Sequence, residues 1–352
     1  MSIFTAVDFD CHEQVTFFYD KETRLKAIVA IHNTYRGPAL GGCRMWAYAD
    51  EQQAITDALR LSRGMTYKAA MANLPFGGGK VIIMGDASKD KSPALLRALG
   101  KCIEGFGGHY ITAEDVGTSV EDMDSILETT SYALGGSKGS GDPSPFTAIG
   151  VCEGIRLSVK YRLQKSSLDS VKIAIQGLGH AGYHLCKLLA KEGAQLIVTD
   201  INHKLVDKVV EKFKARAVLP DAIYGVEADV FAPCALGGIL NDHTIPQLKC
   251  VVVAGSANNQ LDANIHGKIL ADKQILYAPD YVINAGGIIN VSYEGPSYDS
   301  ERVIRHVKKI PETLLHVFQT AETLQIPTSE AADLIAEGRF KEGSDGNHLE
   351  TK

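Results

Sequence analysis

The sequence predicts a two-domain α/β protein, in which one domain contains a doubly wound parallel sheet. Residues 171–200 read as a strand, a glycine-rich turn, a helix and a second strand. Strand-like and helix-like segments keep alternating to about residue 278, which is typical of a doubly wound sheet. Glycine, serine and proline dominate Gly135–Ser144, which marks a domain boundary in a chain of 352 residues, long enough for two cores.

The segment 171–200 has the pattern of a dinucleotide-binding site. Its first strand, VKIAIQ, is short, apolar and rich in β-branched residues, as buried parallel strands are. The spacing G-x-G-x-x-G follows at once, formed by Gly177, Gly179 and Gly182 with Leu178, His180 and Ala181 between them. The first glycine permits the tight turn, the second lets the backbone approach a pyrophosphate, and the third lets the next helix pack on the strand.

The residues after this motif support the same interpretation. The expected helix, 181–192, directs its N-terminal N–H groups at the phosphates. The next strand ends at Asp200, where an acid hydrogen-bonds the ribose hydroxyls of the adenosine. The alternative is a glycine-rich turn in an α/β protein without a cofactor. The strand before the motif, the helix after it and the acid favour dinucleotide binding.

The first domain is expected to mix strands and helices. Strands are predicted at 26–32, 81–84 and 110–112, and helices at 51–74, at 92–106 and after residue 118. Ser92 with Pro93 is a typical helix start, and Thr118 with Glu121 is predicted to form a capping box. Two glycine-rich segments are predicted as loops: NTYRGPALGG, closed by Gly41 and Gly42, and PFGGGK, ending at Lys80.

The second half of the chain begins with a predicted helix at 146–161 and continues with strands in ADVFAPC, KCVVVAG and QILYAP. From Asp280 the pattern is helical, with segments at 280–294, 301–324 and 328–337 that we expect to pack back across a cleft between the domains. The predicted limits are 1–140 and 141–285 for the two domains and 286–352 for the C-terminal helices. The polar tail, 342–352, is expected to fray.

Composition and charge narrow the class of protein. A hydrophobic fraction of 45% and a charged fraction of 22% are ordinary for a soluble globular protein. The net charge of −6 gives no electrostatic reason to expect nucleic acid or an anionic membrane as a partner, and no apolar run is long enough to span a membrane. The N-terminus lacks the basic segment followed by an apolar segment that a signal peptide has.

Seven cysteines without a C-x-x-C pair predict neither a zinc site nor a disulfide framework. They predict reduced thiols in a cytoplasmic protein.

Two lysines occupy unusual places. Lys68 lies in a helical stretch, and Lys80 follows three glycines. The GGGK sequence is not a phosphate-binding loop, because the upstream glycine is missing and Val81 stands where Ser or Thr is required. A lysine in a desolvated cleft beside another cation loses its proton more easily and can act as a base. The alternative for Lys80 is a surface lysine after a flexible turn.

Polar residues also follow two of the predicted strands, where sites of α/β proteins usually lie. Glu114 and Asp115 come after the short strand at 110–112, and Asn258 and Asn259 come after another. An acid in such a place either caps the following turn or moves a proton. An asparagine there either turns the chain or hydrogen-bonds a ligand.

Together, several motifs resemble the glutamate/leucine/phenylalanine/valine dehydrogenase family, and within it the leucine dehydrogenases most of all. In order along the chain they are RGPALGGCRMW, ALRLSRGMTYKAA, LPFGGGKVII, YITAEDVGT, IQGLGHAG, FAPCALGGILN, AGSANNQL and YVINAGGIINV. The resemblance runs from about residue 10 to about residue 340. It implies a substrate-binding and oligomerisation domain at 1–140 and an NAD-binding Rossmann domain at 141–285.

The resemblance also implies roles for individual residues. Lys68 matches the lysine that binds the substrate α-carboxylate, Lys80 the general base that assists attack of water on the imine, and Asp115 the acid that relays protons at the substrate nitrogen. The other implied substrate contacts are Gly41, Asn259 and an apolar side-chain pocket of Leu40, Ala113, Ile288 and Val291. The implied cofactor contacts are Thr147, Asn258, Asp200 and the six residues from Gly177 to Gly182.

The activity that this resemblance implies is the reversible oxidative deamination of branched-chain aliphatic L-amino acids to 2-oxo acids and ammonia. A hydride leaves Cα for the nicotinamide, water adds to the iminium, and ammonia leaves.

NAD is expected rather than NADP, because Asp200 repels a 2′-phosphate and Ile201 and Asn202 offer no arginine. The family also implies a homo-oligomer, while the short polar tail leaves dimer and octamer both open.

Three other interpretations stay open at this point. The same reaction on aromatic amino acids is one, although Leu40 is large enough to obstruct an aromatic ring. A non-catalytic binding protein of the same family is the second, and the presence of Lys80 and Asp115 speaks against it. A hydroxy acid dehydrogenase is the third, but no histidine–carboxylate motif stands out.

Overall fold

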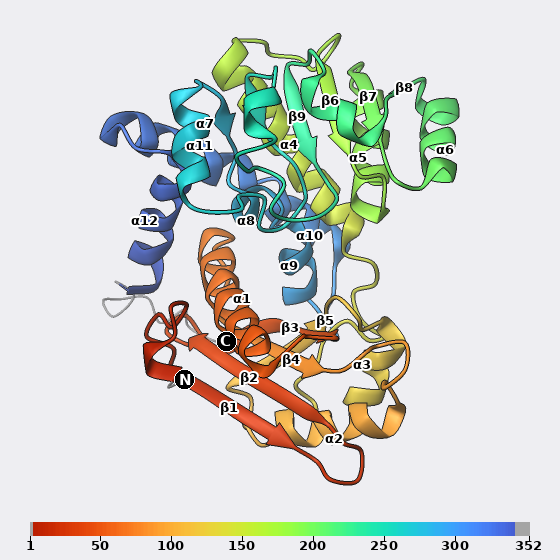
Figure 1. Ribbon diagram of the computed structural model, residues 1–352, viewed down its shortest axis with the longest axis vertical. Coiled ribbons are helices and arrows are strands. Elements are labelled where there is room, and N and C mark those ends of the chain that lie inside the picture. Colours follow the sequence, from red (N-terminus) through yellow and green to blue (C-terminus); the bar gives the residue numbers. More distant parts are fainter. Residues whose placement is uncertain (1–2, 342–352) are drawn as a thin grey trace. The chain divides into compact units, whose positions relative to one another are not determined.

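The computed structural model describes residues 3–341, and the predicted tail at 342–352 lies outside them. The chain forms two compact units (Figure 1). The described part of unit 1 comprises residues 3–141, 291–298 and 336–341, and unit 2 comprises residues 142–290 and 299–335. The chain therefore passes from one unit to the other four times, and the segment after residue 285 is divided between them.

Unit 1 is built on a mixed five-stranded sheet. The strands are β1 (Gln14–Tyr19), β2 (Lys26–Asn33), β3 (Ala39–Trp46), β4 (Gly77–Met84) and β5 (Tyr110–Glu114), in the order β1-β2-β4-β3-β5. β1 and β4 run antiparallel to β2, whereas β3 runs parallel to both β4 and β5. The carboxyl ends of β3, β4 and β5 therefore meet at one edge of the sheet, as in an α/β site.

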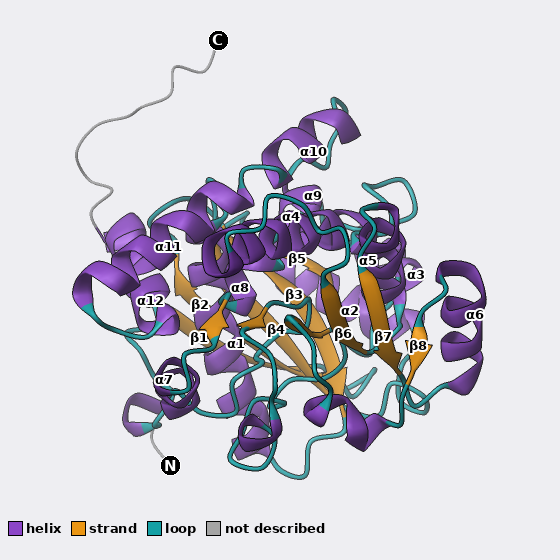
Figure 2. Ribbon diagram, turned by 90° about the horizontal axis from the view of Figure 1, so that it is seen from above, coloured by secondary structure: helices purple, strands orange, loops and turns teal. Residues whose placement is uncertain are grey.

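Helices cover both faces of this sheet (Figures 1 and 2). α1 (Glu51–Met71) packs on β2 and β4 through a small apolar cluster of Ile28, Ala30, Ala54, Ala58 and Ile82. α2 (Pro93–Glu104) and α3 (Val120–Leu127) bury Leu95, Leu96, Leu99, Ile103, Met123 and Ile126 in the larger core on the opposite face. A short 3₁₀ turn, Ile3–Thr5, precedes β1.

Two predicted loops of unit 1 extend too far: residues 34–38 and 75–76 lie outside the strands, but the residues that follow each of them are in strands. Gly41 and Gly42 lie within β3, and the three glycines before Lys80 lie within β4. These glycines do not turn the chain but allow close approach: a Cβ on Gly41 would lie 1.7 Å from the carbonyl oxygen of Gly79. The predicted capping box is also displaced by one residue, because Ser119 and Asp122 form it.

Unit 2 contains a six-stranded parallel sheet, which confirms the predicted doubly wound fold. Its strands are β6 (Lys172–Gln176), β7 (Gln195–Thr199), β8 (Arg216–Ala217), β9 (Val230–Pro233), β10 (Val252–Val253) and β11 (Leu276–Tyr277). The order is β11-β10-β9-β6-β7-β8, with every pair parallel. The order reverses between β6 and β9, the point at which such sheets bind ligands.

The remaining helices are α4 (Ser144–Leu163), α5 (His180–Lys191), α6 (His203–Phe213), α7 (Ile265–Asp272), α8 (Asp280–Ile283), α9 (Gly286–Ser292), α10 (Ser300–Val307), α11 (Ile310–Leu324) and α12 (Thr328–Lys341), with 3₁₀ turns at Pro220–Gly225 and Ile245–Gln247. α10 and α11 replace the single helix predicted at 301–324. Pro311, which has no N–H to donate, lies in the first turn of α11 and starts a new helix there.

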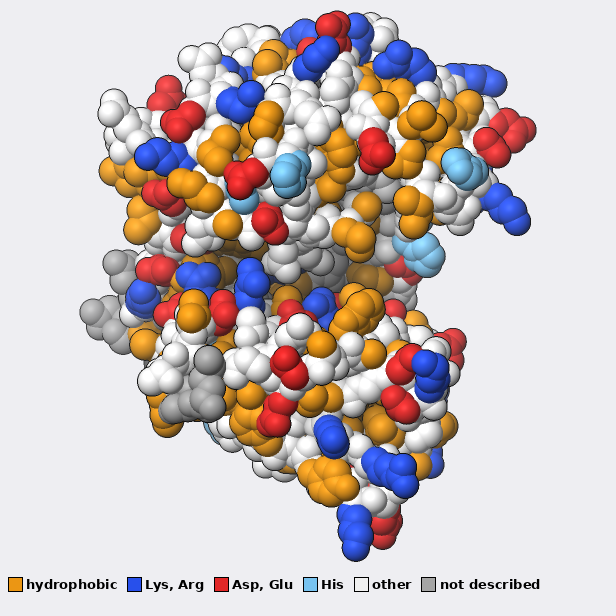
Figure 3. Space-filling view, in the orientation of Figure 1, with side chains coloured by type: hydrophobic (Ala, Val, Ile, Leu, Met, Phe, Trp, Pro, Cys, Tyr) orange, Lys and Arg blue, Asp and Glu red, His pale blue; other side chains and the backbone are white. Residues whose placement is uncertain are grey.

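The surface carries charges of both signs. In Figure 3, lysine and arginine side chains are interspersed with aspartate and glutamate over the visible face, in keeping with a net charge of only −6. Within residues 3–341, none of the helices combines the length and the apolar character that crossing a membrane requires.

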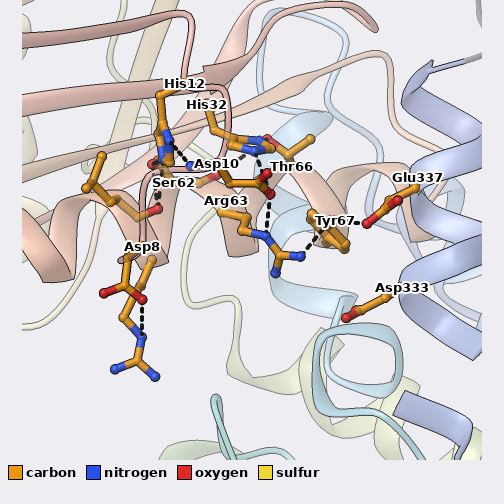
Figure 4. Close-up of polar contacts among 12 residues, drawn as sticks. Asp8, Asp10, His12, His32, Ser62, Arg63, Thr66, Tyr67, Asp333 and Glu337 are labelled. Carbon is orange, nitrogen blue, oxygen red and sulfur yellow. Dashed lines mark hydrogen bonds and ion pairs between the residues drawn. The ribbon is translucent and has the colours of Figure 1, made fainter. Parts of the chain in front are cut away.

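A buried pair of histidines joins β2 to α1 in unit 1 (Figure 4). His32 is 4% exposed, its Nδ1 lies 2.8 Å from the Thr66 hydroxyl, and its ring meets that of His12 edge-on at 4.9 Å. Burial lowers the pKa of His32 to about 4; the nearby His12 acts in the same direction and Asp10 against it. Folded unit 1 therefore holds His32 neutral at pH values where an unfolded chain protonates it.

This histidine makes the stability of unit 1 depend on pH. The folded pKa lies below the ordinary 6.5, so the contribution is complete above pH 6.5 and is lost as the pH falls towards 4, with an upper limit of about 3 kcal/mol. Urea unfolding followed by the fluorescence of Trp46, the single tryptophan, measures it. His32→Gln should flatten the decline in unfolding free energy between pH 7 and 5, while the exposed His109→Gln should not. An unchanged slope in His32→Gln would contradict this assignment.

Candidate active site

The sheet of unit 1 brings a lysine in the middle of β4 and an aspartate directly after β5 into contact. Lys80 on β4 donates to the Oδ2 atom of Asp115, which follows β5, over 2.7 Å. The backbone of Asp115 is fixed as well, since its N–H donates to the Thr118 hydroxyl at 3.0 Å. The structure thus brings together the two residues that the sequence analysis selected for acid–base chemistry.

Strand alternation and one glycine explain this contact. Lys80 lies two residues before Ile82, so both side chains point to the α1 face of the sheet, while Val81 points to the opposite core. Gly42 on the neighbouring strand leaves the room they need. A Cβ at that position would lie 2.7 Å from the Cβ of Asp115 and 3.2 Å from the Nζ of Lys80. Any larger residue at Gly42 would push the pair apart.

The electrostatics keep Asp115 ionised. Burial alone would raise the pKa of this carboxyl, but the Lys80 ammonium and then the Arg44 guanidinium hold it well below its usual range. Lys80 is only 4% exposed, so the two charges are poorly screened by solvent. The Oδ1 atom of Asp115 has no hydrogen-bond partner among residues 3–341, and it is therefore the oxygen available to a ligand.

Arg44 is a member of this group that the sequence analysis did not select. Its Nε donates to the same Oδ2 of Asp115 at 2.9 Å, and its Nη1 donates to Asp57 of α1 at 3.0 Å. The signal was present in RGPALGGCRMW, because the period of a strand places Arg44 on the same face as Leu40 and Gly42. It was hidden because these glycines were interpreted as a loop.

The other predicted substrate contacts are distributed over both units. Lys68 is half-buried on α1. Leu40 pairs with Gly78 of β4 and is 2% exposed, and Ala113 pairs with Gly42 on the other side of β3. Unit 1 therefore contains Leu40, Gly41, Lys68, Lys80, Ala113, Asp115 and Val291, and unit 2 contains Asn259 and Ile288.

In unit 2, the glycine motif has the geometry that a pyrophosphate needs. Gly177 has a φ of +97°, and a Cβ on Gly182 would lie 2.1 Å from the carbonyl oxygen of Gly177. Nothing lies within 4 Å of a Cβ placed on Gly179, the N-cap of α5, and no side chain caps this helix. The space above Gly179 and the free N–H groups of α5 fit a dinucleotide phosphate.

The acid at the end of β7 is tied to the same turn. Asp200 accepts a hydrogen bond from the backbone N–H of Leu178 at 2.6 Å, through Oδ2, and from Asn202 at 2.7 Å, through Oδ1. Each carboxylate oxygen has a second lone pair, so Asp200 can accept a ribose hydroxyl without losing these bonds. No cation of the described chain forms an ion pair with Asp200. Its negative charge can therefore accept hydrogen bonds from ribose hydroxyls, and it would repel a phosphate bound at the same place.

The remaining predicted cofactor contacts also lie in unit 2. Thr147 lies in the first turn of α4 and donates to the carbonyl of Pro143. Asn258 accepts a hydrogen bond from Asn284 at 2.9 Å, and Asn259 adopts a left-handed conformation with a φ of 50°. Both asparagines are exposed, in the loop after β10. His180 and Ala181 begin α5, and His180 is exposed.

Two family models match this chain. The model of the Glu/Leu/Phe/Val dehydrogenase dimerisation domain matches residues 11–132, and the model of the glutamate/leucine/phenylalanine/valine dehydrogenases matches residues 198–340. The first contains Lys68, Lys80 and Asp115, and the second contains Asp200 and both asparagines.

Individual relatives are similar over nearly the whole length. A leucine dehydrogenase of Thermoactinomyces intermedius is 55% identical over 97% of this chain and 94% of its own. A phenylalanine dehydrogenase of Caldalkalibacillus thermarum is 46% identical over the same shares. The crystal structure of L-tryptophan dehydrogenase from Nostoc punctiforme has a TM-score of 0.84 at 45% identity, covering 95% of this chain and 97% of that one.

Proposed function

The chain belongs to the Glu/Leu/Phe/Val dehydrogenase family, and from this premise we propose that it catalyses the NAD-dependent, reversible oxidative deamination of leucine, isoleucine and valine. The products are the corresponding 2-oxo acids and ammonia. The observation that carries the proposal is the contact at 2.7 Å between the buried Lys80 and the partly buried Asp115, with one carboxylate oxygen left open.

Three charged residues of unit 1, Lys68, Lys80 and Asp115, have tasks in the proposed reaction. Lys68 binds the α-carboxylate of the amino acid through its ammonium group. Lys80 first releases its ammonium proton to solvent, and the free amine then accepts a proton from the water that attacks the imine carbon, which restores the ammonium. The open Oδ1 of Asp115 accepts the proton of the substrate nitrogen and returns it when ammonia leaves. Because Lys80 and Asp115 are in contact, these two transfers are coupled.

NAD is the cofactor that the residues of unit 2 fit. When bound, it accepts the hydride from the Cα of the amino acid. The Gly177–Gly182 turn and the start of α5 would hold its pyrophosphate, and Thr147 and Asn258 would contact the nicotinamide end. Asp200, already bonded to the Leu178 N–H, supports NAD over NADP because a carboxylate repels a 2′-phosphate.

The preference for branched aliphatic side chains rests on four apolar residues: Leu40, Ala113, Ile288 and Val291. The 55% identity to a leucine dehydrogenase, against 46% to a phenylalanine dehydrogenase, supports the same choice. The second candidate is the same reaction on an aromatic amino acid, which the similarity to a solved L-tryptophan dehydrogenase favours.

We also place the enzyme in the cytoplasm as a homo-oligomer. All seven cysteines are free, and Cys43, Cys152, Cys186 and Cys250 are buried thiols, as expected in a reducing compartment. The family model over residues 11–132 is that of a dimerisation domain, so the smallest assembly proposed is a two-fold dimer formed by this segment. A monomer in light scattering at micromolar concentration would contradict it.

The formation of reduced cofactor, measured with a panel of L-amino acids and with NAD and NADP in parallel, tests the proposal. Leucine, isoleucine and valine with NAD should give the highest kcat/KM. No reduction with any amino acid would refute the activity, and an aromatic amino acid ranking first would select the second candidate. Equal or better activity with NADP would overturn the role of Asp200.

A further inference from the structure

Arg44 belongs to a chain of charged contacts that runs from α1 to the candidate active site. The Tyr48 hydroxyl donates to Oδ2 of Asp57 at 2.5 Å, and Arg44 donates to the same Asp57 oxygen at 3.0 Å. Arg44 then donates to Oδ2 of Asp115 at 2.9 Å, beside Lys80. The four ionic groups alternate in sign, two positive and two negative, so the cluster is neutral as a whole.

These contacts fix the guanidinium from both sides. Arg44 lies on β3, Asp57 on α1, and Asp115 after β5. Both hydrogen bonds of the guanidinium therefore form only when these three elements are correctly packed. The side chains of Arg44, Asp57 and Asp115 are 23%, 28% and 23% exposed, so solvent weakens the contacts only in part. A planar guanidinium with donors at both Nε and Nη1 can bridge two carboxylates, which an ammonium cannot do in the same geometry.

The arrangement around Asp115 is asymmetric. Both cations, Lys80 and Arg44, take Oδ2, while Oδ1 has no partner within the described chain. A carboxylate held through one oxygen, with its backbone N–H tied to Thr118, has little freedom to rotate. These contacts therefore fix the direction in which the Oδ1 atom of Asp115 points.

The two cations differ in how constant their charge is. In the proposed function Lys80 loses its proton during the reaction, and at that moment it no longer stabilises the carboxylate. Arg44 stays protonated at every pH at which the protein is folded. The Arg44 guanidinium is thus the permanent counter-ion of Asp115, and Asp57 with Tyr48 keeps it from turning away.

We propose that Arg44, tethered by Asp57 and Tyr48, is a positioning residue that holds Asp115 by Oδ2 and directs Oδ1 at the nitrogen of ammonia or of the substrate amine. This inference rests on the proposed function and deepens it, because it assigns the recognition of the nitrogen to an oriented carboxylate. Arg44 itself does not touch the substrate.

Reductive amination, in which ammonium is a separate substrate, tests this directly. Arg44→Met should raise the KM for ammonium and lower kcat, so that kcat/KM for ammonium falls by about ten- to a hundredfold. The KM values for the 2-oxo acid and for NADH should change less than about twofold, because their proposed contacts do not include Asp115. The change also removes one of the two cations that hold the pKa of Asp115 low, so the acid limb of the pH profile should move to higher pH.

Two further variants separate charge from geometry. Arg44→Lys keeps the charge, and should restore the acid limb of the pH profile but not the KM for ammonium, because it cannot bridge Asp57 and Asp115. Asp57→Asn leaves both cations in place and loosens the tether, and should raise the KM for ammonium without moving the acid limb. Asp57→Asn also keeps the proposal testable if Arg44→Met fails to fold. Arg97→Met, which removes a surface pair with Glu128, is the matched control and should behave like the wild type.

The outcomes distinguish a failure of the proposed function from a failure of the role assigned to Arg44. A wild-type protein that reduces no 2-oxo acid refutes the proposed function. An active wild type whose KM for ammonium and acid limb are unchanged in Arg44→Met overturns the role of Arg44 alone. A uniform loss of kcat in Arg44→Met and Asp57→Asn, with a lowered melting temperature and unchanged KM values, would assign the chain of contacts a structural role and also overturn the proposal.

Discussion

Lys80→Ala should lower turnover by roughly a hundredfold or more, as expected for the loss of an acid–base group. The Lys80 side chain is 4% exposed and contacts Asp115 at 2.7 Å. Because the amine is buried there, a lysine on the surface of the protein cannot reach Asp115 to replace it. NAD binding should be nearly unchanged, because the residues proposed to hold it lie in unit 2. Steady-state kinetics with leucine and NAD, together with a titration of NAD binding by fluorescence, measure both expectations.

Two other lysines make this result specific. Lys68→Ala should mainly raise the KM for leucine, because it removes the proposed cation for the α-carboxylate and leaves the Lys80–Asp115 contact intact. Lys91→Ala is the matched control, since Lys91 also forms a partly buried pair with an aspartate, at 2.6 Å from Asp122. It should affect thermal stability more than turnover. Near wild-type turnover in Lys80→Ala would show that its assigned role is wrong.

Glutamate should be excluded from the substrate pocket, while leucine and valine are accepted. The four proposed pocket residues, Leu40, Ala113, Ile288 and Val291, contain no group that pairs with a second carboxylate. Burying that carboxylate unpaired costs several kcal/mol. Discrimination among apolar side chains is weaker, at about 1–3 kcal/mol per methylene. The kcat/KM values for leucine, valine, phenylalanine, tryptophan and glutamate measure the order, and glutamate or an aromatic amino acid in first place would overturn the pocket.

Leu40 is the residue that sets the size of this pocket in our proposal. Leu40→Gly should raise kcat/KM for phenylalanine relative to leucine, because the aromatic ring gains the space of the removed side chain. Leu40 is 2% exposed, so the change also costs about 2–5 kcal/mol of stability, and Leu40→Ala is a milder second variant. Leu99→Ala on α2 removes an equally buried leucine from the opposite core and should leave the ratio unchanged. A constant ratio in both Leu40 variants would remove Leu40 from the pocket.

The fold class was predictable because its main signals are local. In 171–200, one short stretch contains the strand, the three glycines, the helix and the acid, and each has a backbone consequence that does not depend on the rest of the chain. Gly177, with a φ of +97°, is such a case. The alternation of strands and helices then led to the parallel sheet, which β6 to β11 confirm.

The errors arose where a residue serves a distant partner. Glycines at 41–42 and 77–79 look like turns in a sequence, but in the sheet they let neighbouring strands and the Lys80–Asp115 pair come close. Arg44 was missed for the same reason, since its two carboxylate partners lie 13 and 71 residues further along the chain. No local pattern reports such contacts. Lys80 and Asp115, whose acid–base role stays a prediction, were selected through family resemblance, which supplies long-range information that composition and periodicity lack.

The division of the chain between the units affects how the enzyme can be engineered. The described part of unit 1 ends with the last turn of α12, so the chain returns to unit 1 after the cofactor-binding segments of unit 2. A single crossover therefore cannot exchange unit 2 between relatives, and a graft needs a junction at each of the four points where the chain changes unit. The final junction is the most sensitive, because Arg339 donates to the carbonyls of Ala70 and Met71 at the end of α1, the helix that contains Lys68. A chimera or stop codon that removes Arg339 would therefore disturb the end of α1, where Lys68 is the proposed contact of the α-carboxylate, although Arg339 lies some 270 positions away in sequence.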